Sequence, residues 1–183
     1  MVKLEPGDIG ATRGRGILGY LHRNLFAPET DRFHHLLIWK PYKGGDWIIL
    51  ESISKGLSVG LLSWYKAQDI KFYRVDCPSE LRRRAPLELI KWGRSRYDYL
   101  LIPKLVIGSI LAWTKILWKE HRLRKLRAED LCPFYSWDSR LLCTEAVWCG
   151  YNAVGVNIIP YGVPPLPSSF RQAELEGRLS KIE

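Results

Sequence analysis

The first half of the chain alternates short apolar runs with turn-forming segments, a pattern typical of a small β-sheet. Two apolar runs of strand length, residues 33–39 and 47–53, flank a linker with one proline and two glycines. This arrangement predicts a β-hairpin or meander. Residues 7–12, 57–64 and 70–75 are expected to form further short strands.

The second half has helical patterns instead. Residues 79–93 predict one helix, and residues 98–127 predict either one long helix or a broken pair. A further helix is expected over residues 140–153, with Asp138 or Ser139 as its N-cap because short polar side chains accept hydrogen bonds from the first turn.

Residues 14–19, GRGILG, formally match the dinucleotide-binding pattern G-x-G-x-x-G. That pattern needs a clear strand before it and an acidic residue about 20 positions later. Neither is present, so nucleotide binding is not expected. The glycines are instead expected to form a loop that leads into a helix around residues 17–26.

No internal repeat and no domain boundary is evident before residue 160. We therefore expect one domain over residues 1–160 that contains a basic helical segment over residues 82–127. Residues 161–183 begin with a proline-rich stretch and predict an extended C-terminal tail.

Composition indicates a globular protein with an uneven charge. Of the 183 residues, 46% are hydrophobic and 26% charged, which excludes a disordered chain, a collagen and a disulfide scaffold. The net charge is +9, and residues 82–127 hold 13 Lys/Arg and 3 Asp/Glu, leaving 15 and 16 elsewhere. An anionic partner is therefore expected, such as a cell-wall polymer or a membrane surface. Nucleic acid is not expected, because no reading motif is present.

The longest apolar stretch, Tyr99–Trp118, predicts a buried or amphipathic helix. Lys104 and Lys115 leave only ten uncharged residues between them, which is expected to be too short to span a bilayer. Peripheral membrane contact is the less favoured alternative. The N-terminus has no apolar stretch typical of a signal peptide, so synthesis in a cytosol is expected.

One of the four cysteines is a candidate nucleophile. Cys77, Cys132, Cys143 and Cys149 lack the C-x2-C pairs of zinc sites, so no metal and no cofactor is expected. Cys143 lies near the start of a predicted helix. A helix N-terminus stabilises a thiolate and supplies backbone N–H donors, whereas the other three cysteines have poorer settings.

A base and an orienting carboxylate for such a thiol are expected on the predicted hairpin. His34 and His35 are consecutive on an apolar strand, so only one of them can point toward a given site. Glu51 stands in the other, otherwise apolar strand, where a carboxylate is costly unless it is paired. Glu51 is therefore a plausible partner for an imidazole, with the choice of histidine open.

Five short motifs occur in an order that is similar to a known family, the permuted papain-fold thiol hydrolases. This is the YiiX/YebB-like branch of the NlpC-type amidase superfamily, in which the histidine strand precedes the cysteine helix. The five segments resemble the family patterns GDI, HVGIY, VIEA, GkpYDy and fCSELV. They are Gly7–Ile9, His35–Trp39, Ile49–Ser52, Gly93–Tyr99 and Leu142–Val147.

The resemblance implies an α+β, permuted papain-like fold, in which a small antiparallel sheet packs against the cysteine-bearing helix and further helices. It implies Cys143 as nucleophile, His35 as general base and Glu51 as the polar third member. His34 is the alternative base. Alignment with the family favours His35, because Leu36 and Ile38 then share the opposite face.

The activity implied is cysteine-dependent amide hydrolysis, with peptidoglycan peptides as the leading substrate. Two alternatives are kept. One is a lipid-directed acyl hydrolase or transferase on the same fold. The other is a structural or interaction component of a larger assembly, such as a phage tail, where the protein would be virion-associated.

Overall fold

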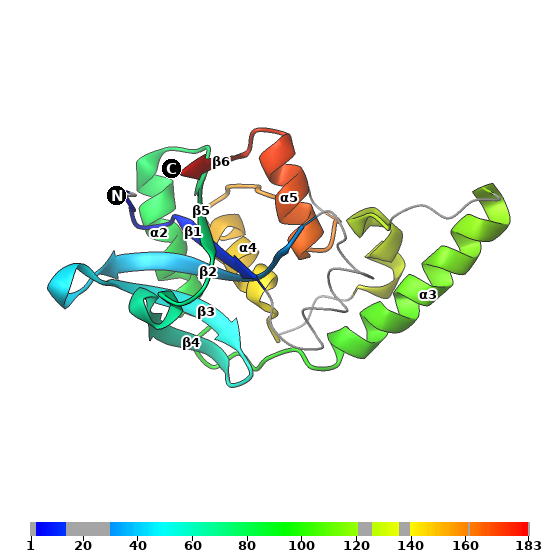
Figure 1. Ribbon diagram of the computed structural model, residues 1–183, viewed down its shortest axis with the longest axis horizontal. Coiled ribbons are helices and arrows are strands. Elements are labelled where there is room, and N and C mark those ends of the chain that lie inside the picture. Colours follow the sequence, from blue (N-terminus) through cyan, green and yellow to red (C-terminus); the bar gives the residue numbers. More distant parts are fainter. Residues whose placement is uncertain (1–2, 14–29, 121–125, 136–139, 161, 183) are drawn as a thin grey trace.

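The computed structural model describes residues 3–13, 30–120, 126–135, 140–160 and 162–182. Within them, six strands form a single antiparallel sheet with the order β4-β3-β2-β1-β5-β6 (Figure 1). The strands are β1 (Ile9–Arg13), β2 (Arg32–Pro41), β3 (Trp47–Ile53), β4 (Gly56–Leu61), β5 (Ile70–Val75) and β6 (Leu179–Ile182). The first five correspond closely to the strands predicted from the sequence.

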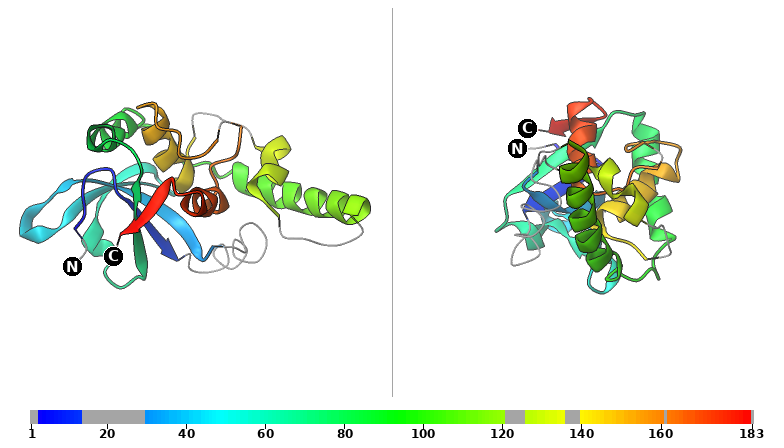
Figure 2. Two further views of the ribbon diagram at one scale, coloured as in Figure 1. Left: turned by 90° about the horizontal axis from the view of Figure 1, so that it is seen from above. Right: turned by 90° about the vertical axis from the view of Figure 1, so that its right-hand side faces the viewer.

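Four α-helices and three 3-10 helices complete the described part of the chain, which confirms the α+β class. The α-helices are α2 (Ser79–Ile90), α3 (Leu101–Glu120), α4 (Cys143–Asn152) and α5 (Pro167–Leu175). The 3-10 helices are η2 (Lys43–Gly45), η3 (Leu62–Tyr65) and η4 (Ala128–Phe134). Helices α2 and α4 lie side by side on one face of the sheet (Figure 2).

The sheet has apolar side chains on both faces. On the helix side, Leu37 and Leu50 pack in one cluster with Val147 of α4. On the other side, Leu36 and Ile38 form a smaller cluster that is covered in part by η3. Burial on both faces explains why β2 and β3 are continuous apolar runs in the sequence rather than alternating ones.

The C-terminal segment is folded, so the expected extended tail over residues 161–183 is wrong. Pro167 is the first residue of α5, a position where its fixed φ and missing N–H cost nothing. Gly177, with φ 76°, lies in the turn between α5 and β6. Strand β6 pairs with β5, and Phe170 and Leu179 are buried in the main core.

Helix starts differ from the sequence prediction. Helix α4 begins at Cys143 with Leu142 as its N-cap, so neither Asp138 nor Ser139 caps it. Those two residues lie outside the described part of the chain, as do the loop and helix expected over residues 14–26.

Helix α3 extends away from the sheet (Figure 1). It is shorter than the predicted segment 98–127, and the Asp98 carboxylate accepts hydrogen bonds from the N–H groups of Leu100 and Leu101, both at 3.0 Å. By length and composition alone α3 could cross a membrane, contrary to the expectation that this segment is too short. One side of it packs instead against η4.

Candidate active site

A β-bulge in the hairpin β2–β3 shifts the pairing of the two strands. Close to the turn, Lys40 lies opposite Ile48. Beyond the bulge at Trp39, Leu36 lies opposite Glu51. This pairing is shifted by one residue relative to the pairing near the turn. Such a bulge sets two residues of one strand against one residue of its partner.

This shift decides which histidine shares a face with Glu51. Without the bulge, Glu51 would lie opposite Leu37 and therefore on the same face as His35. A change of register by one residue moves a side chain to the other face of the sheet. With the bulge, Glu51 lies on the face of His34.

His34, Glu51 and Tyr65 form a compact polar cluster on that face. His34 Nε2 lies 2.6 Å from Glu51 Oε2 and 3.2 Å from the Tyr65 hydroxyl oxygen. The Tyr65 hydroxyl also donates a hydrogen bond to Glu51 Oε2, and its ring stacks on the imidazole with 6.0 Å between centroids. Glu51 is buried, so these contacts supply the partners that a buried carboxylate needs. The position and orientation of the imidazole are thereby fixed.

Cys143 reaches this cluster from the start of α4. Its thiol donates a hydrogen bond to the backbone carbonyl of Phe33, at 3.6 Å, and its interaction with the His34 side chain raises the pKa of that imidazole. The residue before the α4 cap is tied to β3, because the Ser52 hydroxyl donates to the Leu141 carbonyl at 2.6 Å. These two links place the first residue of α4 beside β2 and β3.

The electrostatics of the cluster favour an imidazolium. Burial lowers the pKa of His34, but hydrogen bonds to Cys143 and Glu51 and the negative charges of both groups raise it to about 10. Burial, followed by the hydrogen bond to Glu51, raises the pKa of Tyr65. Tyr65 therefore keeps its proton and donates a hydrogen bond to the carboxylate. The arrangement can hold a thiolate–imidazolium pair supported by a carboxylate.

His35 lies on the opposite face of β2. Its ring packs against Phe170 of α5, with 4.7 Å between ring centroids, and the residue is buried. The adjacent cavity of about 20 Å³ has room for roughly one water molecule and none for a substrate. The structure thus brings Cys143 and Glu51 to His34, the alternative base, and not to His35. The expected position of His35 beside Cys143 is corrected accordingly.

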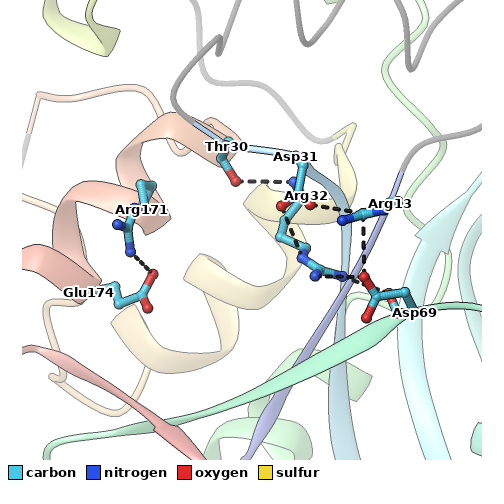
Figure 3. Close-up of polar contacts among 7 residues, drawn as sticks. All are labelled: Arg13, Thr30, Asp31, Arg32, Asp69, Arg171 and Glu174. Atoms are coloured by element: carbon cyan, nitrogen blue, oxygen red, sulfur yellow. Dashed lines mark hydrogen bonds and ion pairs between the residues drawn. The ribbon is translucent and has the colours of Figure 1, made fainter.

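An ion-pair network anchors the start of β2, the strand that carries both histidines (Figure 3). The guanidinium of Arg32 donates to the Asp69 carbonyl at 2.6 Å and to the Asp69 carboxylate at 2.9 Å. Arg13 donates to the Asp31 carboxylate at 2.8 Å. Because Arg32 is buried, its charge requires these partners.

Residues 93–99 (GRSRYDY) lie beside the start of α4. The sequence of this segment does not by itself indicate a chemical role. The Arg96 carbonyl accepts a hydrogen bond from the Leu141 N–H at 2.9 Å, and Tyr97 forms an isolated parallel bridge with Leu141. Burial, and then the charge of Cys143, raises the pKa of Tyr97. A protonated phenol thus lies within electrostatic reach of the sulfur.

Tyr65 and Tyr97 are the site residues that sequence reasoning missed. Tyr97 lies in a motif that the resemblance singled out without a role, and Tyr65 follows β4 in a short stretch, LSWY, that has no distinguishing pattern. Both reach the site through tertiary contacts, so no local signal marks them.

The other three cysteines lie in settings that disfavour a thiolate. Burial is the largest cause that raises the pKa of Cys77, of Cys132 and of Cys149. All four cysteines are free thiols. Among the described residues, no three His, Cys, Asp or Glu side chains are grouped so as to hold a metal ion.

No protein-family model, no curated protein and no solved structure matches this chain. The resemblance to permuted papain-fold thiol hydrolases is therefore carried by the five short motifs alone. The function has to be argued from the site.

Proposed function

We propose that this protein is a cysteine-dependent amide hydrolase with a permuted papain-like fold. Cys143 is the nucleophile, His34 the general base and Glu51 the residue that orients the base. The observation that carries the proposal is the contact of one imidazole with both a buried carboxylate and a thiol at a helix start. A nucleophile, a base and an orienting group within hydrogen-bond reach are the requirement for nucleophilic catalysis.

The two ring nitrogens have different tasks in this mechanism. Nε2 of His34 is engaged by Glu51, which leaves Nδ1 to take the proton from Cys143. The thiolate attacks the carbonyl carbon of an amide, and backbone N–H groups at the start of α4, which have no partner within the helix, hold the developing oxyanion. The amide C–N bond then breaks, the leaving amine takes the proton from His34, and a thioester remains on Cys143.

Water completes the reaction. His34 accepts a proton from the attacking water, and the resulting hydroxide adds to the thioester carbonyl. The C–S bond breaks, the carboxylic acid leaves, and the proton returns from His34 to the sulfur. Glu51 stabilises the imidazolium in both halves of the cycle.

The substrate proposed first is a peptide amide of peptidoglycan, supported by the resemblance of the five motifs. Purified peptidoglycan incubated with the protein should release new amino termini, and Cys143→Ala should not release them. Cys77→Ala, which removes a half-buried thiol outside the cluster, is the matched control and should match wild type. Equal activity of Cys143→Ala would remove Cys143 from the mechanism.

A lipid-directed acyl hydrolase is the second candidate, favoured by one specific observation. Apolar side chains of α3, among them Ile110 and Trp118, are exposed. Release of fatty acid from phospholipid, abolished in Cys143→Ala and without release from peptidoglycan, would select this candidate. A Cys143 thiol that is no more reactive than Cys77 toward iodoacetamide would favour a structural role instead.

A further inference from the structure

Helix α3 has apolar side chains along two opposite sides. The inner side, which includes Leu105, Ala112 and Ile116, is buried in a cluster that includes Leu131 of η4. A helix of a water-exposed domain ordinarily carries polar residues on the side opposite its buried stripe. In α3 that opposite side is mostly apolar.

Five large apolar side chains are exposed on the outer side of α3. They are Ile107, Ile110, Leu111, Leu117 and Trp118, and each is about half exposed or more, with Trp118 at 84%. We call them the outer face. Residues three, four, seven and eleven apart lie on one side of a helix, so the five side chains form one ridge, in which the exposed Thr114 is the polar member.

The position of α3 leaves this ridge open to a large flat partner. The helix points away from the sheet and the other α-helices in Figure 1 and in the left view of Figure 2. Its 20 residues span about 30 Å. A long exposed apolar ridge indicates an interaction site.

The charges around the ridge indicate the chemistry of the partner. Lys104 and Lys115 are exposed and lie three turns apart along one flank of the outer face. They belong to the segment 82–127, which has a net charge of +10. The aliphatic part of a lysine side chain can lie along an apolar surface while its ammonium group remains beside polar or anionic groups such as phosphates. An anionic polymer would pair with the lysines and leave the ridge in water, whereas an anionic bilayer satisfies both.

We propose that the outer face of α3 docks this protein on an anionic lipid bilayer. The helix lies in the plane of the interface, because its inner side stays packed against η4. Ile107, Ile110 and Leu117 enter the acyl region, and Trp118 lies at the headgroup level, where indole rings are favoured. The docking uses no residue of the Cys143 cluster, so it can be tested independently of the proposed hydrolysis.

The test is co-flotation of the full chain with vesicles of phosphatidylcholine containing one third phosphatidylglycerol. Wild type should float with these vesicles and much less with pure phosphatidylcholine. Ile107→Gln/Ile110→Gln/Leu117→Gln should bind at least about tenfold more weakly, because three apolar side chains no longer leave water. The matched control is Val59→Gln/Leu175→Gln, which alters two equally exposed apolar residues elsewhere and should bind as wild type does.

Three results would overturn the proposal. One is that wild type stays with the buffer in the presence of anionic vesicles, and another is that the triple variant floats as well as wild type. The third is self-association of wild type that the triple variant abolishes, without vesicle binding, since the outer face would then be an interface between copies. Cys143→Ala should float as wild type does, whatever becomes of the hydrolase assignment.

Discussion

Replacement of each histidine in turn separates the two neighbours on β2. His34→Ala removes the imidazole that contacts Cys143 and Glu51, whereas His35→Ala removes a ring that packs on Phe170. The first change should lower thiol reactivity, and it also costs stability because the buried Glu51 loses a charged partner. The second should lower stability and leave thiol reactivity in place.

The structure sets the size of both effects. A His34 pKa of about 10 against an ordinary 6.5 corresponds to about 5 kcal/mol of extra interaction with its anionic neighbours. His34→Ala removes the base that takes the Cys143 proton, so alkylation should slow by about 10²-fold or more, the ordinary contribution of a general base. Truncation of the buried His35 ring should cost about 2–4 kcal/mol, which lowers Tm by roughly 5–15 °C.

The assay is the rate of iodoacetamide alkylation at pH 7 and low temperature, followed by the intact mass of each variant. Cys143→Ala gives the background from the other thiols, which should be low because burial raises the pKa of Cys77 and Cys132. Thermal unfolding of the same samples gives Tm. A fully reactive His34→Ala, or an unreactive His35→Ala that is still folded, would refute the placement of His34 as the base.

Three further predictions concern the surroundings of the cluster. Glu51→Gln should lower the pKa of His34, as an NMR titration of the imidazole would measure. In wild type the raised His34 pKa adds stability that is fully present below about pH 6.5 and is lost as the pH rises through about 10. Urea unfolding across this pH range should show a smaller loss of unfolding free energy in Glu51→Gln than in wild type. Gly56→Ala should lower the free energy of unfolding in urea by about 2–5 kcal/mol, because φ is 92° and a Cβ would lie 2.2 Å from a backbone oxygen. The control Gly155→Ala, with φ 77° and open space around its Cβ, should lower it by only about 1–2 kcal/mol. Ser52→Ala should cost about 1–3 kcal/mol by chemical denaturation, because it leaves a buried carbonyl without its donor.

The sequence predicts the elements of the sheet well and the choice of histidine poorly, for one physical reason. Apolar runs bounded by turn residues locate β2 and β3, and Glu51 stands out as a carboxylate in an apolar strand. The face on which Glu51 lies depends on the bulge at Trp39, which leaves no clear mark in the sequence. A slip of one residue is enough to exchange His34 and His35.

The C-terminal segment and the tyrosines of the site were missed for a related reason. The prolines before α5 suggest extended chain, but Pro167 begins a helix whose Phe170 enters the core. Tyr65 gains its contact with Glu51 from the path of the chain after β4. Such contacts depend on segments far apart in the sequence, and local patterns carry no information about them.

The central claim is that Cys143 is a nucleophile able to form and release a thioester, and it can be tested without knowledge of the natural substrate. The protein is mixed with p-nitrophenyl acetate, quenched in acid, and analysed by intact mass and peptide mapping. The account predicts one acetyl group per chain on Cys143, lost again at neutral pH as water completes the cycle, and absent from Cys143→Ala and His34→Ala. Acetylation confined to lysines, or an acetyl group on Cys143 that forms equally fast in His34→Ala, would contradict it.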